Sequence, residues 1–235
     1  MKKVLGVLLL LSTGYASAAE VSGNVTLASD YRFRGISQLK GDISPAIQGG
    51  FDVAFDNGLY AGTWASNVNF SGGALELDVY GGWAGSLTEN IDVDLGYLYY
   101  AYPRDGSDDL DYYEFYGNLT WVGITFGVAY SPDYFAETGK FGYFSADYSW
   151  EFVENFNLDL HLGYNVFEDS SDDSSSAFLS DGEDKYLDYS IGVSTSYWDL
   201  DWAANVVGTD LDDEDYFDDG DLIDPMLVLS VSKSL

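Results

Sequence analysis

The single histidine of the chain, His161, is the first residue that could do chemistry, because a serine hydrolase needs a general base. Alternation along the chain places His161 on one face with Asp159 and Asn165. No Gly-x-Ser-x-Gly turn raises a nucleophilic serine, and one histidine cannot form a multi-histidine zinc site. The absence of cysteine excludes thiolate metal sites, disulfides and cysteine nucleophiles. We therefore expect no enzyme activity, no catalytic or metal-binding residues and no cofactor.

Closely spaced carboxylates are the second candidate, since a pair of them can hydrolyse a glycosidic bond. Glu76 and Asp78 form one such pair, and Asp92 and Asp94 form another. Carboxylates recur on the polar face of nearly every segment, however, so we interpret them as the lining of a water-filled pore. The residues expected to line it are Arg32, Arg34, Asp52, Glu76, Asp78, Asp92, Asp94, Glu114, Asp147, Asp159, His161 and Asp188.

Two of these residues are cations. Arg32 and Arg34 are two positions apart, so both face the pore if their segment is an extended strand. They would pair with acids on neighbouring strands, such as Asp52, or form a cationic patch opposite a carboxylate wall. The pore could be plugged by inward-facing aromatic residues, namely Tyr80, Tyr112, Tyr116 and Trp198.

The composition requires two separate surfaces, one acidic and one apolar. The 235 residues include 40 acidic and 9 basic side chains, a formal net charge of -31, yet 46% are hydrophobic and 17% aromatic. The acidic excess argues against binding to a nucleic-acid backbone. The apolar content is too high for a disordered acidic chain.

The start of the chain has the three parts of a Sec signal peptide. Lys2 and Lys3 are positive, 4–11 is an apolar run too short to span a bilayer, and Ala16-Ser17-Ala18 is a small-residue cleavage site. We therefore predict a signal peptide over 1–18 and an exported β-barrel over 19–235.

The barrel is predicted from alternation, which is clearest near residue 160. Leu158, Leu160 and Leu162 alternate with Asp159 and His161, the signature of a strand with one apolar and one polar face. Strands of about 9–11 residues are long for soluble domains and suit a tilted transmembrane strand. Twelve segments follow the pattern: 21–34, 44–56, 59–70, 74–87, 91–102, 111–121, 123–131, 140–152, 156–167, 186–198, 200–210 and 225–235.

The connections between these segments alternate in length. Short turns such as Asn57-Gly58 lie at one end, longer loops such as 103–110 lie at the other, and aromatic residues concentrate near strand ends. These features are typical of an all-β, transmembrane, antiparallel up-and-down barrel of about twelve strands in the outer membrane of a Gram-negative bacterium. An aromatic-rich β-sandwich is the alternative, but it would not need strand ends richer in aromatic residues than strand centres.

Two of the long loops are strongly acidic. They cover 168–184 and 210–224, and neither has the spacing of a calcium-binding loop. We interpret them as solvated loops. The alternative is weak binding of divalent cations that bridge to lipopolysaccharide phosphates.

Three short sequence motifs near the N-terminus resemble those of a known protein family. The stretch DYRFRGISQ at 30–38, followed by PAIQGGFD at 45–52 and GLYAGTWASN at 58–67, resembles the signature of the TorF family of proteobacterial porins. The motifs cover about 30–67, and the remaining chain matches only as a barrel-like pattern. The resemblance implies an outer-membrane β-barrel with channel activity and brings no catalytic residues.

The functional expectation is a channel for passive diffusion of small hydrophilic solutes, with a preference for cations because of its acidic lumen. Its partners would be outer-membrane lipid, lipopolysaccharide and small solutes or cations, and no nucleic acid. The alternative is a structural or surface-interaction barrel that transports nothing and binds cations through its acidic loops.

Overall fold

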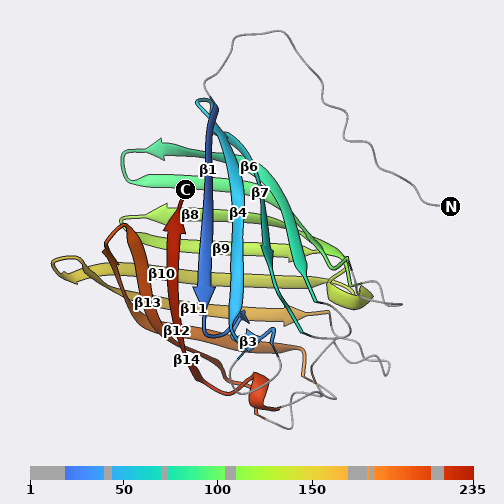
Figure 1. Ribbon diagram of the computed structural model, residues 1–235. Helices are drawn as coiled ribbons and strands as arrows, with labels where there is room; N and C mark the ends of the chain where they lie inside the picture. Colours follow the sequence, from blue (N-terminus) through green and yellow to red (C-terminus); the bar gives the residue numbers. More distant parts are fainter. Residues whose placement is uncertain are drawn as a thin grey trace.

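The computed structural model describes residues 19–39, 44–69, 74–103, 110–168, 179, 183–212 and 220–235. The predicted signal peptide over 1–18 lies outside the described residues. The described chain forms a closed antiparallel barrel of twelve strands, each paired with its neighbours along the chain (Figure 1). The predicted all-β up-and-down barrel is therefore confirmed. No helix among these residues is long and apolar enough to cross a membrane.

The barrel strands end within a few residues of the predicted segments, with one exception at the N-terminus. Closure comes from β1, where Val25 lies opposite Lys233 on one side and Gly49 on the other. A closed barrel leaves no unpaired sheet edge. The strands are β1 (Ala19–Ala28), β4 (Ala46–Phe55), β5 (Leu59–Ser66), β6 (Glu76–Thr88), β7 (Ile91–Ala101), β8 (Tyr112–Trp121), β9 (Ile124–Ser131), β10 (Phe141–Val153), β11 (Phe156–Phe167), β12 (Lys185–Tyr197), β13 (Leu200–Thr209) and β14 (Met226–Ser234).

The exception is the predicted strand 21–34, because β1 ends at Ala28. The chain then folds back, and β2 (Arg32–Phe33) pairs only with β3 (Ile36–Ser37). Between them Arg34 and Gly35 have φ angles of 47° and 84°, as in the type I′ turns of tight hairpins. The prediction that Arg32 and Arg34 lie on one extended barrel strand is therefore wrong. We call residues 30–38 the inward hairpin.

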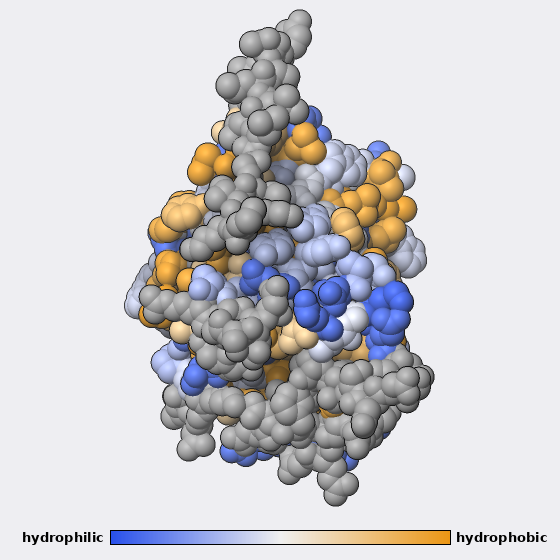
Figure 2. All heavy atoms as spheres, turned by 90° about the vertical axis from the view of Figure 1, so that its right-hand side faces the viewer, coloured by the Kyte–Doolittle hydropathy of each residue, from blue (hydrophilic) through white to orange (hydrophobic). Residues whose placement is uncertain are grey.

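The outer face of the barrel is apolar. Phe51, Leu95 and Ile191 are exposed there, and the residues that alternate with them face the interior. This alternation keeps charge away from lipid, where a basic side chain at the midplane would cost about 2–4 kcal/mol. In the view of Figure 2, hydrophobic residues gather at the flanks and hydrophilic residues near the centre.

One predicted inward residue lies elsewhere. Trp198 is 77% exposed in the turn between β12 and β13 and stacks on Tyr197 at 4.6 Å between ring centres. Trp198 and Asp199 both have positive φ, so they form the two-residue turn and leave the alternation of the strand. Trp198 therefore does not plug the barrel.

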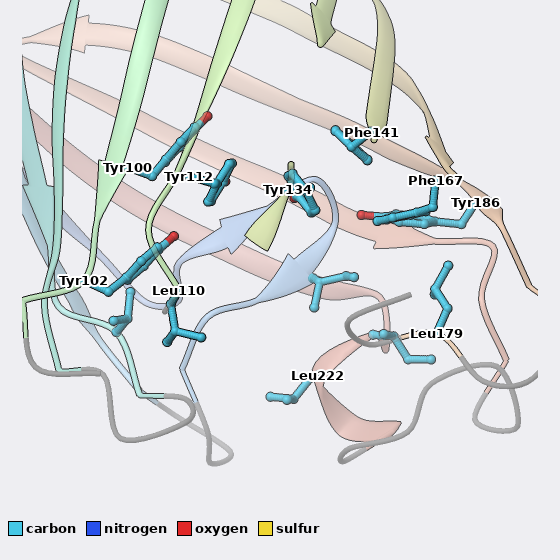
Figure 3. Close-up of a cluster of buried hydrophobic side chains, with 13 residues drawn as sticks. Tyr100, Tyr102, Leu110, Tyr112, Tyr134, Phe141, Phe167, Leu179, Tyr186 and Leu222 are labelled. Atoms are coloured by element: carbon cyan, nitrogen blue, oxygen red, sulfur yellow. The ribbon is translucent and has the colours of Figure 1, made fainter. Parts of the chain in front are cut away.

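The buried hydrophobic cluster lies inside the loop-side end of the barrel (Figure 3). Its members come from the inward hairpin, from loops and from the loop-side ends of β7, β8, β10, β11 and β12, so they narrow the loop-side mouth. Short 3-10 turns at Phe135–Glu137 and Gly220–Leu222 lie in the same loops. We call this group the mouth cluster: Ile36, Val68, Tyr100, Tyr102, Leu110, Tyr112, Tyr134, Phe141, Phe167, Leu179, Tyr186, Leu222 and Ile223.

Candidate functional site

The inward hairpin bridges the lumen from one wall to the other. On one side, Arg34 Nη1 and Nη2 donate hydrogen bonds to Glu114 Oε1 and Oε2 of β8 at 2.8 and 2.9 Å. On the other side, a Cβ on Gly35 would lie 2.5 Å from Thr209 Cγ2 and 2.9 Å from Asp188 Cβ. Only glycine fits in this contact with β12 and β13. The hairpin tip is therefore held between opposite walls of the barrel.

Aromatic rings surround the Arg34 guanidinium. Its Cζ lies 4.3 Å from the ring centre of Tyr143 and 4.7 Å from those of Phe33 and Phe141. These distances suit cation–π attraction, which strengthens when water is excluded. Burial disfavours the charge, but the carboxylate of Glu114 outweighs burial and raises the pKa of Arg34 above its ordinary value. The guanidinium is therefore a permanent cation paired with Glu114.

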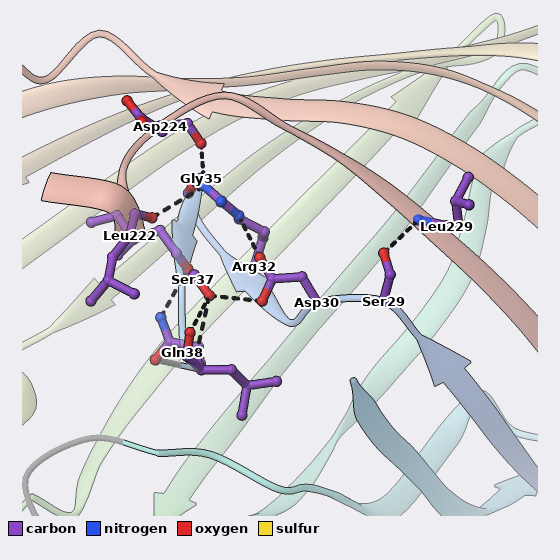
Figure 4. A network of polar contacts seen from close by, with 11 residues as sticks. Ser29, Asp30, Arg32, Gly35, Ser37, Gln38, Leu222, Asp224 and Leu229 are labelled. Atoms are coloured by element: carbon purple, nitrogen blue, oxygen red, sulfur yellow. Dashed lines mark hydrogen bonds and ion pairs between the residues drawn. The ribbon is translucent and has the colours of Figure 1, made fainter. Parts of the chain in front are cut away.

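Arg32 ties the hairpin to the segment before β14 (Figure 4). Its Nε donates to Asp30 at 2.8 Å, and its Nη1 donates to the carbonyl oxygens of Leu222 and Asp224 at 3.1 and 2.8 Å. The predicted pairing with a carboxylate of a barrel strand is found for Arg34 and Glu114, whereas the suggested partner, Asp52, and the alternative of a shared cationic patch are wrong. The physical reason is the hairpin turn, which sends the two side chains to different contacts.

Stacked rings complete the mouth cluster. Tyr134 stacks on Phe141 at 4.1 Å, and Tyr100 stacks on Tyr112 at 4.3 Å between ring centres. Tyr186 donates a hydrogen bond to the carbonyl oxygen of Arg34 at 3.1 Å, which joins the cluster to the hairpin. Burial raises the pKa of Tyr134 to about 12, so its phenol stays neutral. Of the aromatic residues predicted to plug the pore, Tyr112 belongs to the mouth cluster.

Phenol groups bind the carboxylates on the β4–β8 wall. Tyr80 donates to Asp52, Tyr60 donates to Asp94 at 2.5 Å, and Tyr116 contacts the Tyr60 oxygen at 2.5 Å. A phenol that donates to a carboxylate leaves its negative charge in place. This wall therefore keeps an acidic character while its carboxylates are held in fixed positions.

The same arrangement continues toward the mouth. Tyr31 and Tyr102 donate to the two oxygens of Glu76 at 2.6 and 2.7 Å, and Tyr100 donates to Glu114 at 3.1 Å. Burial first, and the Glu76 carboxylate second, raise the pKa of Tyr31 and of Tyr102 well above the ordinary value for tyrosine. Both phenols therefore remain hydrogen-bond donors.

Glycines opposite two of these tyrosines make room for the rings. Gly96 lies directly across from Tyr116, and Gly62 lies across from Tyr80. A Cβ on Gly96 would lie 2.3 Å from Tyr116 Cζ, and one on Gly62 would lie 2.5 Å from the Tyr80 ring. The rings therefore lie against the wall over the glycines and leave the centre of the lumen to other groups.

His161 joins two carboxylates from neighbouring strands. Its Nδ1 lies 2.6 Å from Asp147 Oδ1 of β10, and its Nε2 lies 2.9 Å from Asp188 Oδ1 of β12. Both ring nitrogens face carboxylate oxygens, so both carry a proton and the ring is an imidazolium. Asn165 donates to the second oxygen of Asp188 at 2.7 Å, whereas Asp159 accepts from Ser149. The group is a part of the wall in which one imidazolium is shared by two carboxylates.

A cavity of about 620 Å³ lies beside the inward hairpin. We call it the lumen chamber. Its walls come from β1, β4, β5 and β10–β14, and residues 30–35 of the hairpin form one side. Trp64, His161 and Asp188 line it together with neutral polar side chains: Thr26, Gln48, Ser190, Asn205 and Ser230.

Residues 12–235 match a sequence family described as a bacterial protein of unknown function, Gcw_chp. The chain belongs to the Gcw_chp family. No curated protein matches its sequence.

Three solved porin structures share the architecture of this Gcw_chp chain. The NanC porin is 12% identical with a TM-score of 0.54, and the match covers 91% of this chain and 98% of that one. The KdgM porin is 11% identical with a TM-score of 0.54, covering 93% and 99%. KdgM in complex with disordered oligogalacturonate is 11% identical with a TM-score of 0.55, covering 93% and 99%. These similarities show the fold, a porin-like barrel that fits a bacterial outer membrane.

The Gcw_chp structure places the predicted lining residues at three depths. Glu76, Asp78 and Glu114 are buried near the mouth, and Asp78 Oδ1 has no hydrogen-bond partner among the described residues. Asp188 is buried beside Gly35 of the hairpin, and Asp52, Asp94, Asp147 and His161 are half-buried in the contacts given above. Asp92 and Asp159 lie toward the short turns, where they accept from Ser86 and Ser149 at 2.5 and 2.6 Å.

Several residues that lie in the lumen of the Gcw_chp barrel were not predicted from the sequence to do so. Tyr60, Tyr100 and Tyr102 bind carboxylates, and Trp64 lines the chamber. A signal for Tyr60 was present, because alternation along β5 places it on the polar face. An aromatic residue beside a short turn is, however, expected at the membrane interface.

Proposed function

We propose that the protein is an outer-membrane channel through which small hydrophilic solutes diffuse passively. The observation that carries the proposal is a closed barrel with an apolar outer face and a polar chamber inside. An apolar exterior suits lipid, and a polar interior suits water and solutes. The shared fold with the NanC and KdgM porins and the resemblance of 30–67 to TorF-family porins support it. Residues 1–18 would serve as the Sec signal peptide.

The proposed channel prefers cations. Among the described residues of the lumen, the cations Arg32, Arg34 and His161 each bind a carboxylate. Further carboxylates have only neutral phenol, hydroxyl or amide partners, so the lumen has an excess of negative charge. Such a field concentrates cations and repels anions. Oligogalacturonate, the ligand of the KdgM complex, is an anionic sugar polymer, and the charge of this lumen opposes a solute of that kind. Among the predicted lining residues, the carboxylates without a cationic partner are Asp52, Glu76, Asp78, Asp92, Asp94 and Asp159.

The side chains that fill the loop-side mouth favour a second candidate function, a barrel that transports nothing. The inward hairpin and the mouth cluster fill the loop-side mouth with buried side chains, including Phe141 at 1% exposure. A barrel closed in this way would be a structural or surface-interaction protein that binds cations or lipopolysaccharide through its acidic loops. Most of those loop residues, in 168–184 and 210–224, lie outside the described residues.

Liposome swelling separates the two functions. The folded protein, identified by a gel mobility that changes on heating, is reconstituted and placed in an isotonic solution of a neutral pentose. The channel predicts swelling with the wild-type protein. The closed barrel predicts no swelling with the wild type, and swelling only after residues 31–37 are replaced by a short glycine linker.

A further inference from the structure

The charged residues of the lumen chamber compensate one another. Asp30 pairs with Arg32 at 2.8 Å, and Asp188 shares His161 with Asp147, at 2.9 and 2.6 Å. Arg34 is occupied by Glu114. The chamber differs in this respect from the β4–β8 wall, whose carboxylates have phenol partners. Each charged side chain that lines the chamber therefore already contacts a group of opposite charge, and Arg32 Nη2, which has no hydrogen-bond partner among the described residues, is fully buried.

Neutral polar side chains of the chamber are free to bind a solute. Ser190, Asn205 and Ser230 are half-buried and make no side-chain hydrogen bond to any other described residue. Gln48 reaches Ser66 at 3.4 Å, a long contact that leaves most of its amide available. Hydroxyl and amide groups both donate and accept hydrogen bonds. The chamber thus presents several neutral donors and acceptors on β4, β12, β13 and β14.

An aromatic ring lines the same chamber. Of the six tryptophans, Trp64 lines the chamber, and the other five are at least 36% exposed at other positions. Tyr31 and Trp64 pack in a T-shaped arrangement at 5.5 Å between ring centres, and Glu76 accepts a hydrogen bond from the Tyr31 phenol at 2.6 Å. The negative face of an aromatic ring attracts weakly positive C–H groups. Trp64 is therefore a positioned platform for a saturated ring.

We infer that the lumen chamber binds a neutral sugar of one or two rings, as a solute of the channel. This inference rests on the proposed function and names its substrate class. The chamber volume of about 620 Å³ falls in the range of small-molecule sites. The C–H face of the sugar packs on Trp64, and its hydroxyl groups bind Ser190, Asn205 and Ser230. A charged sugar would lose hydration without gaining a free partner of opposite charge.

Three hexoses with one ring skeleton test the charge requirement. Glucose is neutral, glucosamine is a cation and glucuronate is an anion near pH 7. Calorimetry on the folded full-length barrel in detergent should show glucose binding about tenfold more tightly than either charged hexose, a difference of about 1.4 kcal/mol. Equal or tighter binding of glucuronate or glucosamine would overturn the inference.

Tryptophan fluorescence tests the location. Glucose should change the emission of the wild-type protein saturably, and Trp64→Phe should abolish that change while retaining calorimetric binding. Trp64→Ala removes the ring and should weaken binding about tenfold. Trp202→Phe, a change at an exposed position on β13, is the matched control and should alter neither signal. Wild-type affinity in a folded Trp64→Ala barrel would show that the sugar does not bind in the chamber.

Bilayer conductance on the same preparation separates this inference from the proposed function. A barrel that conducts ions but does not bind glucose overturns the chamber ligand and keeps the channel. A barrel that binds glucose through Trp64 but passes neither ions nor solutes keeps the binding site and overturns the channel.

Discussion

Arg34 and Glu114 are 80 residues apart in the sequence, yet their side chains meet at 2.8 and 2.9 Å inside the barrel. The pair fixes one side of the inward hairpin to β8, while Gly35 contacts β12 and β13 on the opposite side. Strand number sets the diameter of a barrel wall. Within that wall, this pair holds the inward hairpin across the loop-side end of the lumen.

Arg34→Ala should widen the mouth and destabilise the barrel. It releases the hairpin and leaves the buried Glu114 carboxylate without its cation, a change that costs about 3–5 kcal/mol in buried ion pairs. We expect larger single-channel conductance and a lower temperature for the heat-dependent gel shift. The double variant Arg34→Met with Glu114→Gln removes both charges, so it should recover stability while remaining wide. Wild-type conductance in Arg34→Ala would mean that the hairpin does not control the mouth.

A comparison of two glycines tests the contact at the hairpin tip. Gly35 and Gly123 have nearly equal φ angles of 84° and 85°, so alanine is strained by about 1–2 kcal/mol at either position. A Cβ on Gly35 would clash with Thr209 at 2.5 Å, whereas the nearest atom to one on Gly123 is 3.9 Å away. Gly35→Ala should therefore lower the free energy of unfolding in urea more than Gly123→Ala. Equal losses would contradict the tight contact.

Gly96→Ala should narrow the lumen. The new methyl group would lie 2.3 Å from Tyr116 Cζ, so the ring must leave the wall and lose its contact with Tyr60. We expect smaller conductance from a barrel that still folds. Gly142→Ala is the matched control, because its nearest neighbour would be 4.0 Å away. Unchanged conductance in Gly96→Ala would show that the space over this glycine does not matter to the pore.

Replacing Asp92 and Asp94 together by Asn should weaken selectivity for K⁺ over Cl⁻. Both carboxylates lie on β7 with hydroxyl partners, so their charge is not cancelled by a neighbouring cation. The loss should be largest at low salt, because screening over about 10 Å already operates at 0.1 M. Glu168→Gln, in an exposed ion pair with Lys140, is the control and should leave the reversal potential unchanged. An identical reversal potential in the Asp92/Asp94 variant would exclude these carboxylates as the source of selectivity.

The strands and the sorting of residues between lipid and lumen were predictable, because both follow from a period of two. Leu158 and Asp159, for example, are adjacent in the sequence, and their polarity indicates which of them faces lipid and which faces the lumen. The period of two gave the wrong result at Arg32 and Arg34. The alternating sequence pattern continues past the end of β1 at Ala28, although the chain there turns into the inward hairpin. The Arg34-Gly35 pair was the local signal of a turn, and it was outweighed by the pattern around it.

Contacts between distant strands could not be predicted from the sequence. The distance between Arg34 and Glu114 depends on the curvature of the closed barrel and on the direction in which the hairpin folds. The seating of Tyr116 over Gly96 depends on register, which alternation alone does not specify. The position of Trp64 in the lumen was not predicted either, because a tryptophan on a barrel strand is expected at the membrane interface.

The most direct test of the account is the current through single molecules of the folded wild-type protein in a planar bilayer under a KCl gradient. We expect discrete conductance steps with a reversal potential that favours K⁺ over Cl⁻. A correctly folded, membrane-inserted barrel that passes no current, or one that favours Cl⁻, would contradict a cation-preferring channel.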